Sequence, residues 1–285
     1  MTPFFCRCLL ALGGMCIWSV SAAPAELSWE AVFRGPESEP DSVAFPVGDG
    51  RYFVAVALSG VQIADVRLRS AGRILPAEVF VDPVSRVVIF RISGPAEKAL
   101  PLASSRSAAA GAEWAVKGGG KAEAEGWIKQ INGKMLPLSL LKMDYSATVP
   151  RAGTPLTDAS GAVVAIAHQA SDGRRGYALP VEVVKRVLED VQGHGRVSRG
   201  WIGLKLRPEA KVPQVTKVQE GSPSALAGVR EGDVLLQIGQ LRTPEYADAV
   251  NAFFFLRPGV SAPLRLRRGN QELSLSVTPV RKEGN

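Results

Sequence analysis

Few side chains of this sequence could act as acid, base, nucleophile or metal ligand. Its two histidines are His168, which follows an apolar segment, and His194, which lies between two glycines. Pairing of His168 with Asp172 would give acid–base chemistry, although a lone histidine at a strand end is usually structural. Ser160 lies in an Asp-Ala-Ser-Gly sequence that is typical of a turn rather than of a nucleophile. With two isolated histidines we expect no metal site, and no cofactor.

The first 22 residues have the pattern of a signal peptide. A single early charge, Arg7, precedes an apolar run from Leu9 to Val20 and small residues that suit cleavage before Ala23. The run is too short to span a bilayer, and a lipoprotein cut before Cys16 is disfavoured because the bulky Met15 precedes it. We expect export, with no transmembrane span in the mature chain and a periplasmic location.

Composition limits the remaining possibilities. The chain has 285 residues, of which 46% are hydrophobic and 21% charged, with a net charge of +7. That size favours two domains. Basic residues are spread along the chain, without the concentrated patch and interleaved aromatic residues of a nucleic-acid site, so we expect no nucleic-acid partner. All three cysteines lie in the expected signal peptide, which leaves the mature chain without a thiol: Cys6, Cys8 and Cys16.

The elements change character along the chain. Between Trp29 and Ile166, short apolar runs alternate with Gly, Pro, Ser and Asp, which predicts an all-β barrel or sandwich. A helix and linker are expected over 181–198, because valines recur there at helical spacing between Pro180 and the glycines around His194.

A compact second unit is expected over 199–282. Ser222 and Pro223 predict the N-cap and first position of a short helix. The segment 245–256 predicts an amphipathic helix, and Gly269-Asn270 predicts a hairpin turn. We therefore expect a small α+β unit after the β-rich region.

Three ordered motifs in this unit resemble a PDZ domain of HtrA/Deg-type proteases. They are Trp-Ile-Gly-Leu at 201–204, Gly-Ser-Pro-Ser-Ala-Leu-Ala-Gly-Val at 221–229 and Gly-Asp-Val-Leu at 232–235. The resemblance extends back through the helix and linker to the segment 143–155. It implies a mostly β chain: a trypsin-like double β-barrel over 23–180 followed by a PDZ domain, a small partly open barrel.

The resemblance also carries an expectation about activity. In an ungapped register, Ala152 stands at the family's nucleophilic serine, Pro150 at an oxyanion glycine and Arg86 at the acid. Asp82 matches a non-catalytic aspartate, and the segment 53–66 offers no histidine as base. An alanine cannot attack a carbonyl and a proline has no N–H to donate. On these positions we expect a pseudoprotease without enzymatic activity.

The PDZ resemblance implies a peptide-binding groove. Such domains add an extended C-terminal peptide to a sheet edge and hold its carboxylate on loop N–H groups. The expected loop is Gly200-Trp201-Ile202-Gly203, with Arg199 adding positive charge, and the expected edge strand is 204–206. The other wall is the helix over 245–256. Expected peptide-binding residues are Arg199, Gly200, Trp201, Ile202, Gly203, Leu204, Leu206, Tyr246, Val250 and Phe253.

Three functions follow as hypotheses. The first is an exported adaptor or regulator in protein quality control that binds protein C-termini or unfolded polypeptides and recruits an active protease. The second is an active, atypical HtrA-type serine endopeptidase. The third is a structural scaffold, in which the barrel mediates oligomerisation. The resemblance implies a homotrimer, for which Trp29 and Phe33 could supply aromatic contacts.

Overall fold

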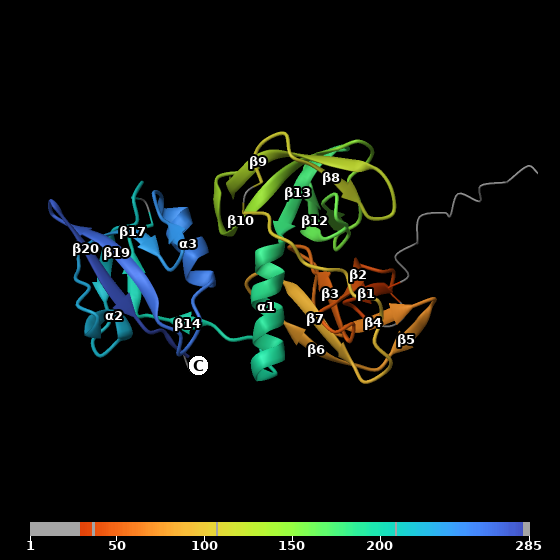
Figure 1. The fold of residues 1–285 in the computed structure, drawn as a ribbon, viewed down its shortest axis with the longest axis horizontal. Coiled ribbons are helices and arrows are strands. Elements are labelled where there is room, and N and C mark those ends of the chain that lie inside the picture. Colours follow the sequence, from red (N-terminus) through yellow and green to blue (C-terminus); the bar gives the residue numbers. More distant parts are fainter. Residues whose placement is uncertain (1–28, 36–37, 107, 209, 282–285) are drawn as a thin grey trace, which may run out of the picture.

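The computed structural model describes residues 29–35, 38–106, 108–208 and 210–281 (Figure 1). The expected signal peptide and its cleavage site lie outside these residues. Within the described part of the chain, no helix is long and apolar enough to cross a membrane. Strands predominate over helices, so the mostly β prediction is confirmed.

The first sheet has seven strands in the order β5-β4-β1-β2-β3-β7-β6. Side chains alternate across its central strands, as expected for a sheet that is covered on both faces. On β3, Val54 and Val56 face the main core, whereas Phe53 and Ala55 face a separate cluster with Phe33. The strands are β1 Trp29–Val32, β2 Ser42–Val47, β3 Tyr52–Val56, β4 Arg67–Ser70, β5 Arg73–Leu75, β6 Ala77–Val81 and β7 Val87–Ile92.

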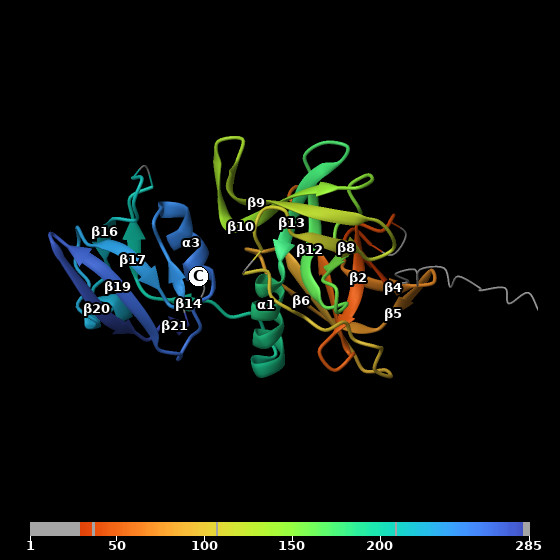
Figure 2. The ribbon, with the colours of Figure 1, turned by 45° about the horizontal axis from the view of Figure 1, so that its top comes forward.

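A closed six-stranded barrel follows, in the order β10-β13-β12-β11-β8-β9. Its interior contains the fully buried Leu141, Met143 and Leu156. Two of its strands, β9 and β10, form a long hairpin that extends beyond the barrel towards α3 (Figures 1 and 2). The strands are β8 Glu113–Val116, β9 Lys121–Ile131, β10 Lys134–Tyr145, β11 Pro155–Thr157, β12 Val163–Ala170 and β13 Arg175–Pro180.

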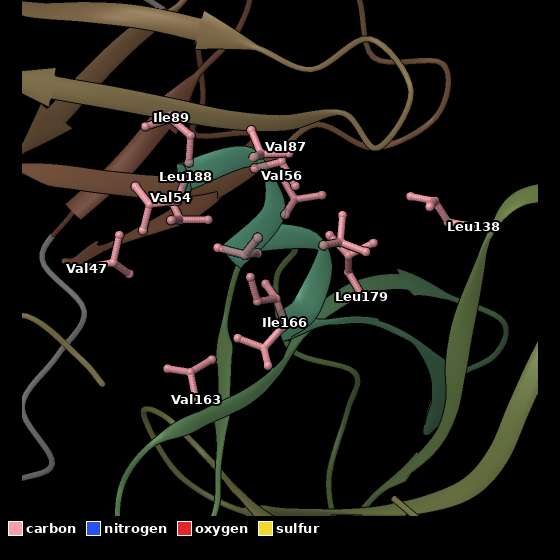
Figure 3. Packing of buried hydrophobic residues seen from close by; sticks show 14 of the residues in the cluster. Val47, Val54, Val56, Val87, Ile89, Leu138, Val163, Ile166, Leu179 and Leu188 are labelled. Atoms are coloured by element: carbon pink, nitrogen blue, oxygen red, sulfur yellow. The ribbon is translucent and has the colours of Figure 1, made fainter. Parts of the chain in front are cut away.

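Helix α1, Val181–His194, follows the barrel and packs against both the first sheet and the barrel. It begins directly after Pro180 and ends at Gly195, which adopts a left-handed conformation (φ 61°) and donates its N–H to the Val191 carbonyl. Its buried valine face packs into a core that takes side chains from both β units, such as Val56 and Ile166 (Figure 3). This shared core makes the sheet, the barrel and α1 one structural body.

The C-terminal unit, residues 200–281, contains a four-stranded sheet in the order β18-β17-β19-β20. It also has two pairs of short strands, β14 with β21 and β15 with β16. Its core contains the fully buried Leu235, Leu264 and Leu266. Its elements are β14 Gly200–Trp201, β15 Leu204–Leu206, β16 Val215–Val218, α2 Pro223–Leu226, β17 Val234–Ile238, β18 Leu241–Arg242, α3 Tyr246–Phe254, β19 Ala262–Arg268, β20 Gln271–Val277 and β21 Val280–Arg281.

Helix α3 docks against the long hairpin of the barrel. The Ser139 N–H donates to Asn251 Oδ1 at 3.2 Å, and Lys129 Nζ lies 2.8 Å from Asp248 Oδ1 and 3.5 Å from Glu245 Oε2. Phe254 is buried in the core around α1 rather than in the core of its own unit. The helix that was expected to line the peptide groove is therefore also the contact to the first domain.

Candidate functional site

The loop before β11 closes tightly on the first sheet. Ala152 is buried, and its carbonyl accepts hydrogen bonds from the Val43 N–H at 2.8 Å and Ser42 Oγ at 3.1 Å. Gly153 has a φ of 84°, and an added Cβ would lie 2.1 Å from the Val43 carbonyl oxygen. Only glycine fits this approach, which explains the glycine at position 153. Pro150 lies beside it, on a cavity of about 250 Å³.

Arg86 and Asp82 lie at the turn between β6 and β7. Arg86 adopts a positive φ of 57°, and its guanidinium donates to the carbonyls of Ala57 and Val61. Asp82 is fully buried and accepts the Ser85 N–H at 2.9 Å as well as the Ser85 hydroxyl. Both side chains fix the backbone where the sheet faces the barrel.

His168 lies on β12, at the same junction. It lines a cavity of about 80 Å³ together with Ser59, Ser85 and Arg86. Burial, helped by the positive charge of Arg86, lowers the pKa of His168 to about 4, so the imidazole is neutral at pH 7. A base with so low a pKa binds a proton weakly at pH 7, so the cavity holds a neutral histidine rather than an effective general base.

The other polar candidates are engaged locally. Asp172 Oδ1 accepts the N–H groups of Arg174 at 3.0 Å and Arg175 at 2.8 Å, and it makes no described hydrogen bond to His168. Ser160 Oγ donates to Asp158 Oδ1 at 2.6 Å inside an exposed turn. Within the described residues, no three His, Cys, Asp or Glu side chains are grouped to hold a metal ion.

The expected carboxylate loop is built around Gly203. Its φ is 79°, and an added Cβ would lie 2.2 Å from Ser222 Cβ. Ser222 is held in place because it caps α2 by accepting the Ala225 N–H at 3.2 Å. Among the described residues, neither Ile202 nor Gly203 donates its N–H to another backbone group, whereas both of their carbonyls accept one. Two adjacent N–H groups are thus left for an acceptor from outside.

The expected walls of the groove are β15 and α3. Strand β15 pairs only with β16 among the described strands, so its other edge carries unpaired backbone groups. Leu204 and Leu206 are half-buried against the core of the unit, as is Phe253 from α3. Tyr246 and Val250 are also half-buried and share the helix face of Phe253 by spacing. Ile202 is 4% exposed and belongs to the core.

Three residues at the start of the expected site have other contacts. Arg199 forms an ion pair with the buried Asp82, and its Cζ lies 4.0 Å from the ring centroid of Phe254. Burial lowers the pKa of Arg199, and Asp82 opposes that shift. Gly200 and Trp201 form β14, which pairs with β21. The charge of Arg199 is therefore directed to the first domain.

The sequence did not reveal the buried polar cluster beneath the linker. Arg186 is 2% exposed and forms an ion pair with Asp190, one helical turn further on. Its guanidinium also donates to the carbonyls of Ser198 at 2.9 Å and Leu256 at 3.1 Å. The sequence feature that could have indicated this cluster is an arginine and an aspartate four residues apart on a valine-rich helix face.

Residues 200–278 match the family model of the PDZ domain. A protein named as a probable periplasmic serine endoprotease, DegP-like, from Pseudomonas fluorescens is 26% identical over 284 residues, which cover 86% of this chain and 59% of the relative. The protein of the same name from Rhizobium meliloti is 29% identical over 48% of this chain and 31% of its own length.

Solved structures agree on the fold. The HtrA-type protease AlgW with a tripeptide has a TM-score of 0.65 at 20% identity, over 93% of this chain and 96% of that chain. The serine endoprotease from Yersinia pestis has a TM-score of 0.55 at 20% identity, over 92% of this chain and 95% of that chain. The predicted resemblance to HtrA-type proteases with a C-terminal PDZ domain is thus confirmed, as is the trypsin-like double barrel followed by a PDZ fold.

One prediction from the sequence is contradicted. The chain was expected not to be an enzyme, yet the similar proteins are named serine endoproteases and the structural neighbours are HtrA-type proteases. The expectation rested on an ungapped register that placed Ala152, Pro150 and Arg86 at catalytic positions. Nothing in the comparisons shows that catalytic residues are substituted, so absence of activity does not follow. The chain spans 59%, 31% and 50% of the lengths of three of these relatives.

Proposed function

We propose that this protein binds the C-termini of polypeptides through its PDZ domain. Gly203 carries the proposal: its backbone conformation and its contact with Ser222 exclude any side chain, and its N–H is directed to no other described backbone group. The carboxylate of a peptide would bind these N–H groups, while the peptide backbone would pair with the open edge of β15. Affinity at the micromolar level, about −8 kcal/mol, suits a reversible interaction.

Fluorescence anisotropy on the full chain tests this function. Labelled decapeptides with an apolar last residue and a free carboxylate are compared with the same peptides carrying a C-terminal amide. Binding only of the free acids supports the proposal. Val250→Asp, in α3, should abolish binding, whereas Val260→Asp, at a valine that is 54% exposed in the loop after α3, should not. Equal binding of acid and amide would contradict it.

Serine endopeptidase activity is a second candidate, because the similar proteins are named serine endoproteases. Digestion of unfolded casein by the full chain, together with covalent labelling by a fluorophosphonate probe, would support this activity. If neither occurs under conditions in which the peptide assay shows binding, endopeptidase activity is contradicted. Peptide binding and cleavage are thereby tested separately.

The cellular location and the oligomeric state of the protein are also proposals. The relatives are named periplasmic, and the signal-peptide pattern of residues 1–22 agrees with export. We place the protein in the periplasm, as an adaptor or regulator in protein quality control that assembles into a homo-oligomer, with a trimer as the expected form. Sedimentation equilibrium of the exported chain, and its distribution in fractionated cells, test these two points.

A further inference from the structure

Two lysines lie opposite each other on the exposed face of the β15–β16 pair. Lys205 on β15 is paired directly with Lys217 on β16, and both side chains are exposed. Residues opposite each other in an antiparallel pair have Cβ atoms about 4.5–5.5 Å apart, and like charges at this position are destabilising. In the described part of the chain, neither lysine takes part in an ion pair.

The surrounding surface adds to this positive charge. Arg207 directly follows β15, and Lys211 lies in the loop before β16; both are exposed. The acidic residue nearest in sequence to Lys217 is Glu220, which lies beyond the end of β16 and forms no described ion pair. On the four-stranded sheet of the same unit, Arg265 pairs with Glu272 and Arg268 with Asp233, while Arg242 and Arg267 form no described ion pair.

The geometry points to a ligand with negative side chains: we infer that Lys205 and Lys217 select peptides with acidic residues just before the C-terminus. This inference rests on the proposed peptide-binding function and specifies its substrate class. A like-charged cross-strand pair is locally unfavourable, and departures of this kind from local rules are expected at functional sites.

Strand alternation assigns the acidic positions. Leu204 and Leu206 point to the apolar core, so Lys205, between them, points outward. A peptide strand added beside β15 has the same alternation. If its last side chain faces Leu204, its third-last side chain also faces the apolar side, and its second-last and fourth-last side chains lie on the face of Lys205. Aspartate or glutamate at these two positions would lie within reach of both lysines.

The expected effect is moderate and depends on salt. Exposed ion pairs contribute about 0.2–1 kcal/mol each, which corresponds to a factor of up to about five per acidic residue. Two acidic residues should therefore raise affinity about tenfold in low salt. The advantage should largely disappear at 1 M salt, where the Debye length falls to about 3 Å.

Anisotropy with three matched peptides tests the inference on the full chain. The peptides share an apolar last residue and carry glutamate, glutamine or lysine at the second-last and fourth-last positions. The expected order of affinity is glutamate, glutamine, lysine. The double variant Lys205→Glu with Lys217→Glu should reverse this order. The control, Lys98→Glu with Lys134→Glu, makes the same change in net charge at exposed lysines of the first domain and should not.

A stability measurement adds an independent readout. Lys217→Glu converts the repulsive pair into an attractive one, so the variant should unfold at higher denaturant concentration while losing its preference for acidic peptides. Equal affinity of the three peptides, or an unchanged order in the double variant, would overturn the inference and leave C-terminal binding intact. If no free-acid peptide binds at all, the peptide-binding function itself is contradicted, and the selectivity with it.

Discussion

Arg199, at the entrance to the PDZ domain, forms an ion pair with the fully buried carboxylate of Asp82 in the first domain. The same guanidinium lies over the ring of Phe254, at the end of the helix that docks on the barrel. One side chain at the end of the linker thus contacts both the first domain and α3. Such a contact helps to fix the orientation of the PDZ domain relative to the first domain.

Arg199→Ala should weaken this junction. The substitution leaves Asp82 buried without its cationic partner, which costs about 3 kcal/mol for a buried pair. The hydrogen bonds from Ser85 remain and keep the loss near that value. Urea denaturation with fluorescence detection checks the free energy of unfolding. Arg196→Ala, at an exposed residue of the same linker, should leave it unchanged. A similar loss in both variants would contradict the assigned role.

Gly203→Ala should disrupt the carboxylate loop. Its Cβ would meet Ser222 at 2.2 Å and would also impose strain on a φ of 79°. We expect a loss of at least about 1 kcal/mol in stability and no measurable peptide binding. Gly228→Ala is the matched control, because its φ is 83° and no atom lies within 4 Å of the added Cβ. Retained binding in Gly203→Ala would exclude this loop as the carboxylate site.

Tyr145→Phe should maintain or increase stability. The Tyr145 hydroxyl is buried in the barrel and has no hydrogen-bond partner among the described residues. Burial raises its pKa, so the hydroxyl stays protonated. Removing an unsatisfied buried hydroxyl can raise the free energy of unfolding by about 1 kcal/mol. Tyr145→Ala should instead lower it by about 3–5 kcal/mol through the cavity it creates. Denaturation of both variants measures the difference; a clear loss in Tyr145→Phe would show that the hydroxyl has a partner.

Acidification should destabilise the chain through His168. Its pKa of about 4 in the folded chain lies below the ordinary value of 6.5, so the unfolded chain takes up the proton first as the pH falls. Stability from this group is full above pH 6.5, decreases between 6.5 and 4, and changes no further below 4. The loss is at most about 3 kcal/mol, since the side chain retains some exposure to solvent. In His168→Gln this component of the pH profile should be absent.

Local motifs made much of the PDZ domain predictable from the sequence. Ser222 caps α2 as expected, and β19 and β20 turn at Gly269-Asn270. These features depend on residues within a few positions of each other, where backbone preferences decide the structure. The helix α1 was equally predictable from the sequence, because its valines repeat at helical spacing.

Contacts between distant segments could not be predicted in this way. Arg199 was expected beside a peptide, but its partner is an aspartate more than a hundred residues earlier in the chain. Of the three consecutive phenylalanines, Phe253 packs into the PDZ core, whereas Phe254 packs on the core around α1. Such choices depend on tertiary packing. The prediction of no enzymatic activity was wrong for a related reason. It inferred the catalytic positions from an ungapped alignment of a short segment with the family motif, and such an alignment does not fix where side chains lie in the fold.

The pairing of β14 with β21 brings the entry and the exit of the PDZ domain together, with Gly200 opposite Arg281 and Trp201 opposite Val280. A segment whose two ends are hydrogen-bonded neighbours can be inserted into a loop of another scaffold without stretching that loop. The 200–281 segment is therefore suited to grafting as a recognition cassette. Its host would have to replace the contact of Arg186 with the Leu256 carbonyl, which in this chain comes from outside the cassette.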